Sequence, residues 1–245
     1  MKEKKFYDKS FYKDQASGSI RSARAVVPHI LEFTGAKSVV DIGCGVGSWL
    51  TVFAENGIQD YRGVDGDYVN EEQLLIGKEH FRKYDLNNRY EEGKKYDLCI
   101  SLEVAEHLPQ EVSETFVATL TGLSDVVMFS AAIPLQLGTH HVNEQYPEFW
   151  ANIFEKMGYK TVDCIRPLIW NNEGVEYWYK QNILVFVKAD KLAEYPALLP
   201  AASATSKDYL TKMHPGIFTH KVFKRWMFNT YFTLLKVMGK TYKGV

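Results

Sequence analysis

The sequence has little cysteine and no long apolar run. Its three cysteines, Cys44, Cys99 and Cys164, are far apart and match no CxxC metal spacing. Because an odd number also argues against a disulfide framework, we predict a reduced, cytoplasmic protein. The longest aliphatic and aromatic runs, such as ILVFV at 183–187, are far shorter than the ~20 residues that span a bilayer. The charged beginning, MKEKKFYDKSFYKDQ, predicts that there is no secretory signal.

The two signs of charge are unevenly distributed along the chain. The net charge is −1, but residues 206–245 hold eight Lys or Arg and one acid, so they carry +7 and leave −8 on residues 1–205. We therefore expect no nucleic-acid partner for this acidic body. In residues 207–245, apolar positions recur at three- and four-residue spacing between basic ones, which predicts a basic amphipathic helix. Docking on the body or in a homodimer, peripheral membrane contact and nucleic-acid contact all remain open for this helix.

Short apolar runs alternate with helical patterns, which is typical of an α/β protein with a mostly parallel sheet. Helices are predicted at 48–57, 111–123 and 147–158. No helix is predicted between the last two strands, so we expect them to pair antiparallel. Two prolines and small residues predict a linker at 196–206, between a domain of residues 1–195 and the segment 207–245. The predicted strands are 38–43, 61–65, 81–85, 96–101, 125–130, 161–165 and 182–188.

A glycine-rich loop, SVVDIGCGVGSW at 38–49, is the first candidate binding motif. Gly43, Gly45 and Gly47 follow a strand that contains Asp41, and they precede a helix. Glycines at this place let the backbone turn sharply and let a cofactor approach without Cβ clashes. The third glycine comes one position earlier than in a GxGxxG loop, and an acid precedes the first. This favours a cofactor with a cationic or amino-bearing group over a pyrophosphate, although a structural turn explains the loop alone equally well.

The ends of the next strands carry further candidate ligands. Asp65 closes the second strand 22 residues after the first glycine of the loop, near the ~20 expected for an acid that binds a ribose. Asp85 ends the third strand and is followed by Leu86, so a carboxylate lies beside a backbone N–H as an adenine would need, although an aspartate there is also a typical turn cap. Ser101 and Leu102 end the fourth strand, on the side where open α/β sheets bind ligands.

Together these segments resemble the class I S-adenosylmethionine-dependent methyltransferases over about residues 36–190. DIGCGVG is similar to their first motif, GVD to their ribose acid, YDL at 84–86 to their adenine contact and YDLCISLEVAEHL to their fourth-strand motif. The resemblance implies a Rossmann-like seven-stranded, mostly parallel sheet with an antiparallel last strand and helices on both faces, followed by the C-terminal helix. It also implies contacts to the methionine part (Asp41, Gly43, Gly45, Gly47), the ribose (Asp65), the adenine (Asp85, Leu86) and the sulfonium (Ser101, Leu102) of the cofactor.

The stretch SLEVAEHLP at 101–109 adds acid/base chemistry. Glu103, Glu106 and His107 have offsets of zero, three and four, so one face of a helical turn would carry all three. A cation site, a histidine base without metal and a structural helix start remain open. The loop GTHHVNEQYPEFW at 138–150 follows the fifth strand on the same side and supplies further histidines. Glu144 and Gln145 in this loop are interpreted as substrate contacts or as a solvated helix start.

ExxEH followed by a later histidine is similar to two methyltransferase subgroups, the ubiquinone-pathway O-methyltransferases and the small-RNA 2′-O-methyltransferases. This resemblance implies a divalent cation, and mixed carboxylate and imidazole ligands favour Mg²⁺, Mn²⁺ or Fe²⁺. By spacing to the following helix, His140 is the better match to the later ligand, and His141 is the additional histidine. The candidate ligands are thus Glu103, Glu106, His107 and His140, and the candidate catalytic residues are His107 and His141.

The leading functional hypothesis is O-methylation of a small polar acceptor, a sugar or phosphorylated metabolite used in surface polysaccharide. It follows from the acidic body, the polar THHVNEQ loop and the aromatic residues of the second half. An RNA 2′-O-methyltransferase is the alternative within the same class. The alternative from another class is an assembly protein that binds the cofactor without turnover.

Overall fold

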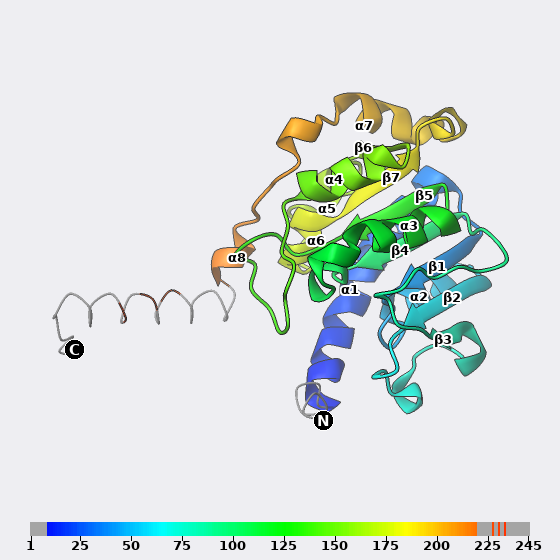
Figure 1. Ribbon diagram of the computed structural model, residues 1–245, viewed down its shortest axis with the longest axis vertical. Coiled ribbons are helices and arrows are strands. Elements are labelled where there is room, and N and C mark those ends of the chain that lie inside the picture. Colours follow the sequence, from blue (N-terminus) through cyan, green and yellow to red (C-terminus); the bar gives the residue numbers. More distant parts are fainter. Residues whose placement is uncertain (1–8, 220–226, 228–229, 231–232, 234–245) are drawn as a thin grey trace.

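The computed structural model describes residues 9–219 and the single positions 227, 230 and 233. In this part of the chain, seven strands form one sheet in the order β3-β2-β1-β4-β5-β7-β6 (Figure 1). All seven predicted strands are present, with ends that differ by a few residues. They are β1 (Ser38–Ile42), β2 (Asp60–Asp65), β3 (Phe81–Lys83), β4 (Leu98–Leu102), β5 (Val126–Ser130), β6 (Tyr159–Val162) and β7 (Leu184–Lys188).

Strands β1 to β5 pair in parallel, and β7 runs antiparallel between β5 and β6. This confirms the predicted mostly parallel, Rossmann-like sheet with an antiparallel last strand. The chain moves outward from β1 to β3 on one side and then returns to start β4 on the other side of β1. The carboxyl ends of β1 and β4 therefore meet at the switch point of the sheet, where such folds bind ligands.

The predicted helices after β1, β4 and β5 are all present, as α2, α3 and α4. The expectation of no helix between the last two strands is wrong. Two short helices, α5 and α6, lie there, and neither shows an amphipathic pattern in the sequence. The longer helices are α1 (Lys9–Thr34), α2 (Ser48–Glu55), α3 (Ser113–Leu123) and α4 (Pro147–Lys156). The shorter ones are α5 (Arg166–Ile169), α6 (Tyr177–Asn182), α7 (Leu199–Ala204) and α8 (Gly216–Thr219). Single 3₁₀ turns are η2 (Glu71–Gln73), η3 (Lys78–His80), η4 (Ala105–His107), η5 (Gln110–Val112), η6 (Leu192–Glu194), η7 (Pro196–Leu198) and η8 (Lys207–Tyr209).

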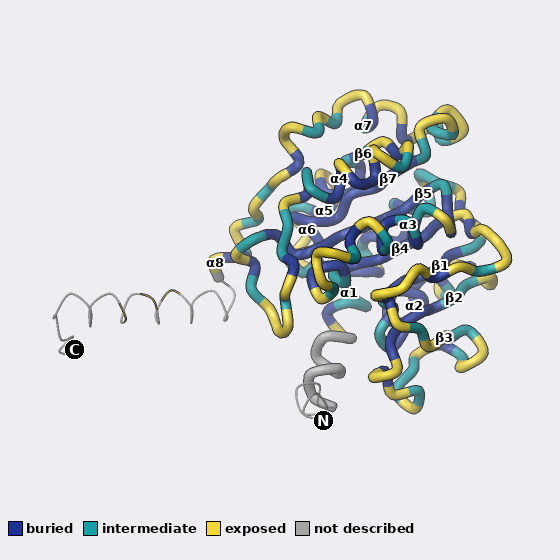
Figure 2. Tube along the Cα trace, in the orientation of Figure 1, coloured by how far each residue is buried: buried dark blue, intermediate teal, exposed yellow. Residues whose placement is uncertain are grey.

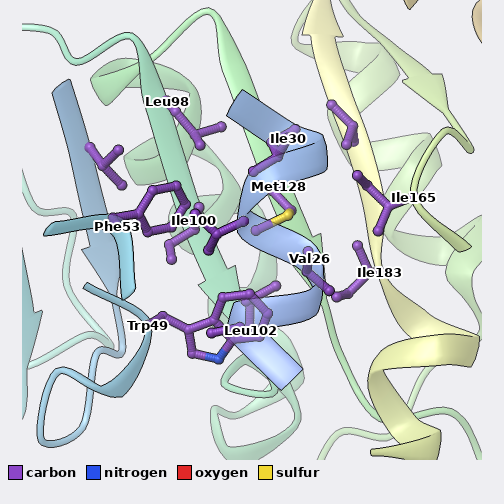
Figure 3. Packing of buried hydrophobic residues seen from close by; sticks show 14 of the residues in the cluster. Val26, Ile30, Trp49, Phe53, Leu98, Ile100, Leu102, Met128, Ile165 and Ile183 are labelled. Carbon is purple, nitrogen blue, oxygen red and sulfur yellow. The ribbon is translucent and has the colours of Figure 1, made fainter. Parts of the chain in front are cut away.

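No element was predicted at helix α1, whose interior contains Gly18 and Pro28, two residue types that disfavour a helix interior. Its apolar face packs on the sheet, and tertiary packing of this kind is the main source of helix stability in proteins. Figure 3 shows Val26 and Ile30 of α1 against Met128 of β5 and the side chains of β4. A fully buried residue such as Ile30 contributes about 1.5–3 kcal/mol through burial alone.

The two faces of the sheet form two separate cores. Figure 2 shows that the strands between them are mostly buried. Helices α1 and α2 cover one face, where Phe53 and Ile100 belong to the same cluster. Helices α3 and α4 cover the other face, where Phe154 stacks on Phe186 with ring centroids 3.8 Å apart. Because both faces of the central strands are buried, ligands meet the sheet at its carboxyl edge.

The stretch predicted as a linker, 196–206, contains η7 and α7. Within it Leu198 and Ala202 are buried in the core on the α1 side of the sheet. The boundary at residue 195 stays a prediction. Most of the predicted amphipathic helix, residues 220–245 other than 227, 230 and 233, lies outside the described residues. Among the helices that are described, none has the length and apolar character needed to cross a membrane.

Candidate active site

The glycine loop joins β1 to α2 at the carboxyl edge of the sheet. The backbone φ angles of Gly43, Gly45 and Gly47 are 86°, 54° and 86°, a region that favours glycine. A Cβ on Gly43 would lie 2.3 Å from the Val104 side chain, so this turn packs directly against the chain that follows β4. A Cβ on Gly45 would meet no atom within 4 Å. The loop is therefore tight on its inner side and open where a cofactor would lie.

Asp65 ends β2 beside this loop, as the sequence predicted. Its carboxylate accepts hydrogen bonds from the backbone N–H groups of Gly45 and Gly66, both at 2.6 Å, and from the Tyr68 hydroxyl. Burial raises the pKa of Asp65, and these three donors oppose that rise. Because a ribose diol offers hydroxyl donors like that of Tyr68, the geometry fits an acid that binds a ribose.

Asp41 lies inside β1, between Gly63 of β2 and Ile100 of β4 in the sheet register. It is almost fully buried, and burial, followed by the charge of Asp65, raises its pKa well above the usual range. The structure thus places Asp41 next to the glycine loop, beneath the place expected for the methionine part of the cofactor.

Asp85 lies two residues beyond the end of β3, not at its end, and it is exposed. Its carboxylate accepts hydrogen bonds from the backbone and side-chain N–H groups of Asn87, at 3.0 and 2.7 Å, and from the side chain of Asn88. This is the turn-capping role that the sequence left open. Leu86 is buried in the core on the α3 side. Contact of either residue with an adenine stays a prediction.

Ser101 and Leu102 form the end of β4, next to the glycine loop. The Ser101 hydroxyl donates a hydrogen bond of 2.7 Å to the carbonyl oxygen of Ile42, the last residue of β1. This bond ties the two central strands together at the switch point. Both residues are buried, so they shape the floor of the site.

The segment after β4 does not form the single helical face that the spacing predicted. Glu103 has a left-handed backbone with φ 58°, and only Ala105–His107 form a 3₁₀ turn, η4. The reversal at Glu103 separates its side chain from those of Glu106 and His107. A repeat of three and four residues places side chains on one face only while the backbone stays helical.

Glu103 is instead held by buried amides. One carboxylate oxygen accepts a hydrogen bond of 2.7 Å from Gln136 and the other accepts one of 3.1 Å from Asn182. Gln136 in turn accepts hydrogen bonds of 2.8 Å from Gln181 and from Asn182. Burial raises the pKa of Glu103, and the amide donors oppose that rise. Sequence reasoning missed these three amides, because they come from the loop after β5 and from α6 and match no motif.

Glu106 is the opposite case. Its side chain is completely buried, and neither carboxylate oxygen has a hydrogen-bond partner of good geometry among the described residues. The backbone N–H groups of Glu106 and Ala132 lie close enough to oppose the rise of its pKa, but less than burial raises it. Burial, followed by the charge of Glu103, raises its pKa well above the usual range. An unpartnered buried carboxylate is costly, so this position requires a proton or a cation.

Two imidazoles lie beside Glu106. One ligand atom from each of Glu106, His107 and His141 lies within 4.8 Å of the others, and the two rings meet edge to face with centroids 4.9 Å apart. The outer edge of His107 is exposed, while its inner side is enclosed. Burial and the charge of His141 lower the pKa of His107 to about 4, so this ring is neutral at pH 7.

His140, the ligand expected from the sequence, does not belong to this group in the described part of the chain. It is exposed, with a left-handed backbone (φ 59°), and its carbonyl oxygen accepts a hydrogen bond of 3.3 Å from His107 Nδ1. The turn at His140 brings the ring of His141 to the site. Spacing in the sequence cannot show which of two adjacent histidines faces the site, because the backbone conformation of the loop decides which ring points towards it.

Glu144 and Gln145 also lie within this loop. Glu144 accepts a hydrogen bond of 2.8 Å from His141 Nδ1. Gln145 donates a side-chain hydrogen bond of 3.0 Å to Asn143. The contacts of both residues are therefore within the loop, and substrate contact by either stays a prediction.

Comparisons with known proteins agree with this architecture. A family model described as "Methyltransferase domain" matches residues 18–163. No curated protein sequence matches the chain.

Similar solved structures include the methyltransferase domain of bacterial CtHen1, with 21% identity, a TM-score of 0.52 and coverage of 69% of this chain and 98% of that chain. DesVI from Streptomyces venezuelae has 14% identity, a TM-score of 0.55 and coverage of 74% and 96%. The magnesium protoporphyrin IX methyltransferase ChlM from Synechocystis PCC 6803, with bound SAH, has 21% identity, a TM-score of 0.53 and coverage of 72% and 87%.

At these identities the structural matches establish the fold. The family match spans more than half of the chain and contains the glycine loop, Asp65 and the segment after β4. The chain therefore belongs to the methyltransferase domain family and is a class I S-adenosylmethionine-dependent methyltransferase.

Proposed function

We propose that the chain transfers a methyl group to an oxygen atom of a small polar acceptor, and that Glu106, His107 and His141 hold a divalent cation for this reaction. The observation that carries the cation is the Glu106 carboxylate, which is buried without a hydrogen-bond partner. A cation at this place would offset the cost of burying the charge. The imidazoles of His107 and His141 supply the remaining ligand atoms of the group.

Hydrogen bonds leave one nitrogen of each ring ready for a cation. Carbonyl and carboxylate oxygens are acceptors, so the Nδ1 atoms of His107 and His141 must be the donors to His140 and Glu144. In the neutral form each ring then has its lone pair on Nε2, the form a metal ligand requires, and in His141 this nitrogen lies beside the backbone of Gly138. Mixed oxygen and nitrogen ligands fit Mn²⁺, Mg²⁺ or Fe²⁺ better than a structural zinc.

S-adenosylmethionine supplies a methyl group on a sulfonium, and a bound cation lowers the pKa of a coordinated acceptor oxygen. The residues of the chain bind the cofactor and orient the groups of the site. Asp65 and the glycine loop fix the nucleoside, and Gln136 and Asn182 hold the Glu103 carboxylate through hydrogen bonds. With a pKa of about 4, His107 takes up few protons at pH 7, which favours a ligand role over that of a general base.

The acceptor class follows from charge and surroundings. Residues 1–205 carry −8, which disfavours a polyanion such as RNA on the body of the protein. The loop after β5 exposes the polar side chains of Thr139 and His140 and the aromatic ring of Tyr146, and a sugar acceptor could use hydrogen bonds and ring stacking of these kinds. An RNA 2′-O-methyltransferase remains the second candidate, because the EVAEH segment resembles those enzymes and residues 206–245 carry +7.

Metal removal tests the cation. We expect methyl transfer in a cell extract to stop in excess EDTA and to return when Mn²⁺ or Mg²⁺ is added beyond the chelator. Cofactor affinity, measured by calorimetry in the same buffers, should stay unchanged, because the glycine loop and Asp65 have no contact with Glu106. Full activity in excess chelator would contradict the cation site.

Label transfer tests the acceptor. The protein is incubated with methyl-labelled S-adenosylmethionine and a cell extract, and the products are separated by size and by nuclease sensitivity. Label in the small-molecule or glycan fraction is expected. Label in nuclease-sensitive material would establish the RNA candidate instead.

A further inference from the structure

We propose that Glu144 is a positioning residue that holds the His141 ring in one orientation and one tautomer and that pins the loop carrying it. The inference rests on the proposed cation site, in which His141 is a ligand and the orientation of its ring determines how well it binds.

Among the described residues, the hydrogen-bond donors to the Glu144 carboxylate come from the loop after β5. One carboxylate oxygen accepts hydrogen bonds from His141 Nδ1 at 2.8 Å and from the backbone N–H of Leu137 at 2.9 Å. The other accepts a hydrogen bond from the backbone N–H of Leu135 at 3.0 Å. The side chains of His141 and Glu144 are only 12% and 17% exposed, so solvent competes little for these bonds. A carboxylate that receives three donors from one loop fixes the shape of that loop.

The backbone of the loop needs such an anchor. Leu135, Leu137 and His140 have φ angles of 74°, 58° and 59°, which L-residues rarely adopt. Such conformations persist where the surroundings enforce them. Glu144 binds the N–H groups of two of these three residues, so it stabilises the conformation that presents His141.

The other end of the loop is tied to the candidate ligand Glu106. The backbone N–H groups of Val142 and Asn143 both donate to the carbonyl oxygen of Glu106, at 2.9 and 3.0 Å. The Asn143 side chain donates to Ser113 at 3.2 Å. Positions 142 and 143 are thus fixed against η4, and the orientation of the adjacent His141 ring depends on Glu144.

Gly138 limits the ring from the opposite side. A Cβ at Gly138 would lie 2.1 Å from His141 Nε2, so the ring packs directly on the bare backbone. The φ angle of Gly138 is not in the left-handed region, so alanine is compatible with the backbone there. Gly138→Ala therefore displaces the His141 ring without removing a polar group.

This arrangement has a known chemical use. A histidine that binds a metal commonly donates its other ring N–H to a carboxylate, which fixes the tautomer and raises the basicity of the ligating nitrogen. Loss of such a partner typically costs 10–100-fold in metal affinity. The Nδ1–Glu144 bond places His141 in this class.

The test is a titration of the full-length protein with Mn²⁺, followed by electron paramagnetic resonance of the free ion. We expect Glu144→Ala and Gly138→Ala each to weaken Mn²⁺ binding by about 10–100-fold. Glu144→Gln should lose less, because its one acceptor oxygen can keep the bond to His141 Nδ1. The control Glu173→Ala, at an exposed position in the β6–β7 connection, should match the wild type, and cofactor affinity should be the same in all variants.

Nitrogen-15 NMR of histidine-labelled, metal-free protein gives a second readout. We expect His141 to be protonated on Nδ1 in the wild type and to populate both tautomers in Glu144→Ala. Unchanged Mn²⁺ affinity and an unchanged tautomer in Glu144→Ala and Glu144→Gln would overturn the inference. A wild-type protein that binds no Mn²⁺ would instead overturn the proposed cation site, and the NMR result would then decide the role of Glu144 by itself.

Discussion

The two halves of the candidate site are built in different ways. In the cofactor half, at the ends of β1, β2 and β3, Asp65 accepts its hydrogen bonds from residues at most 20 positions away. In the acceptor half, beyond β4 and β5, Glu103 is held by Gln136 and Asn182, which are 33 and 79 positions away. Positive φ angles fall on glycines in the first half and on Glu103, Leu135, Leu137 and His140 in the second.

The two halves also differ in how their acids are satisfied. Asp65 in the cofactor half receives three hydrogen-bond donors from the chain, whereas Glu106 in the acceptor half receives none among the described residues. A carboxylate that accepts hydrogen bonds can orient a neutral ligand, whereas a buried carboxylate without such bonds requires a proton or a cation. Binding of the cofactor and binding of a cation should therefore respond to different substitutions.

The largest expected effect is on turnover. His107→Ala and His141→Ala should each lower kcat by about 10²–10⁴-fold, because each removes a group that acts directly at the acceptor oxygen or its cation. Cofactor affinity, measured by calorimetry, should change less than about twofold, since neither ring contacts the cofactor half.

His140→Ala is the matched control for these variants. It leaves the carbonyl oxygen of residue 140 in place and removes an exposed ring, so kcat should stay within about threefold of the wild type, as for most surface substitutions. A collapse of activity in His140→Ala with normal activity in His141→Ala would restore the ligand assignment made from sequence spacing.

The next effect concerns the cofactor half. Asp65→Asn should weaken S-adenosylmethionine binding by about 10–100-fold, since hydrogen bonds to a charged group are worth about 1.5–3 kcal/mol and 1.4 kcal/mol is a factor of ten. Asp67→Asn, at an exposed acid nearby, is the control. Mn²⁺ affinity should be unaffected by both, and a parallel loss of Mn²⁺ binding in Asp65→Asn would show that the halves are coupled.

The smallest effect is on the pH dependence of stability. The pKa of His107 falls from 6.5 to about 4 on folding, so between these values the unfolded state binds more protons than the folded state. His107 therefore costs stability progressively as the pH falls from 6.5 towards 4. The raised pKa of Glu106 acts in the opposite direction, but Glu106 is present in both the wild type and His107→Ala.

Urea unfolding of both proteins between pH 4.5 and 7.5 measures this difference. The free energy of unfolding of His107→Ala should fall less on acidification than that of the wild type. Because the outer edge of His107 is exposed, solvent screening should keep the difference to about 1 kcal/mol or less. Parallel curves would show that the ring is not enclosed in solution.

Sequence reasoning was most accurate where the contacts are local. The seven strands, helices α2, α3 and α4, the glycine loop and Asp65 follow from short patterns that the structure confirms. It failed at α1, where packing on the sheet overrides Gly18 and Pro28, and at α5 and α6, which lack an amphipathic period. In the site it missed Gln136, Gln181 and Asn182, because no local pattern marks an amide that becomes buried through contacts across the fold.

The sequence by itself determined the class of fold, the cofactor-binding edge and the residue types available for chemistry after β4 and β5, because strand periodicity, turn glycines and acid spacing are local properties of the chain. Only the tertiary structure decided that Glu103 is held by hydrogen bonds while Glu106 is unpartnered. It also decided that His141, and not the adjacent His140, joins Glu106 and His107. Those choices depend on left-handed turns at Glu103 and His140 and on burial of side chains from distant segments, neither of which has a signature in short stretches of sequence.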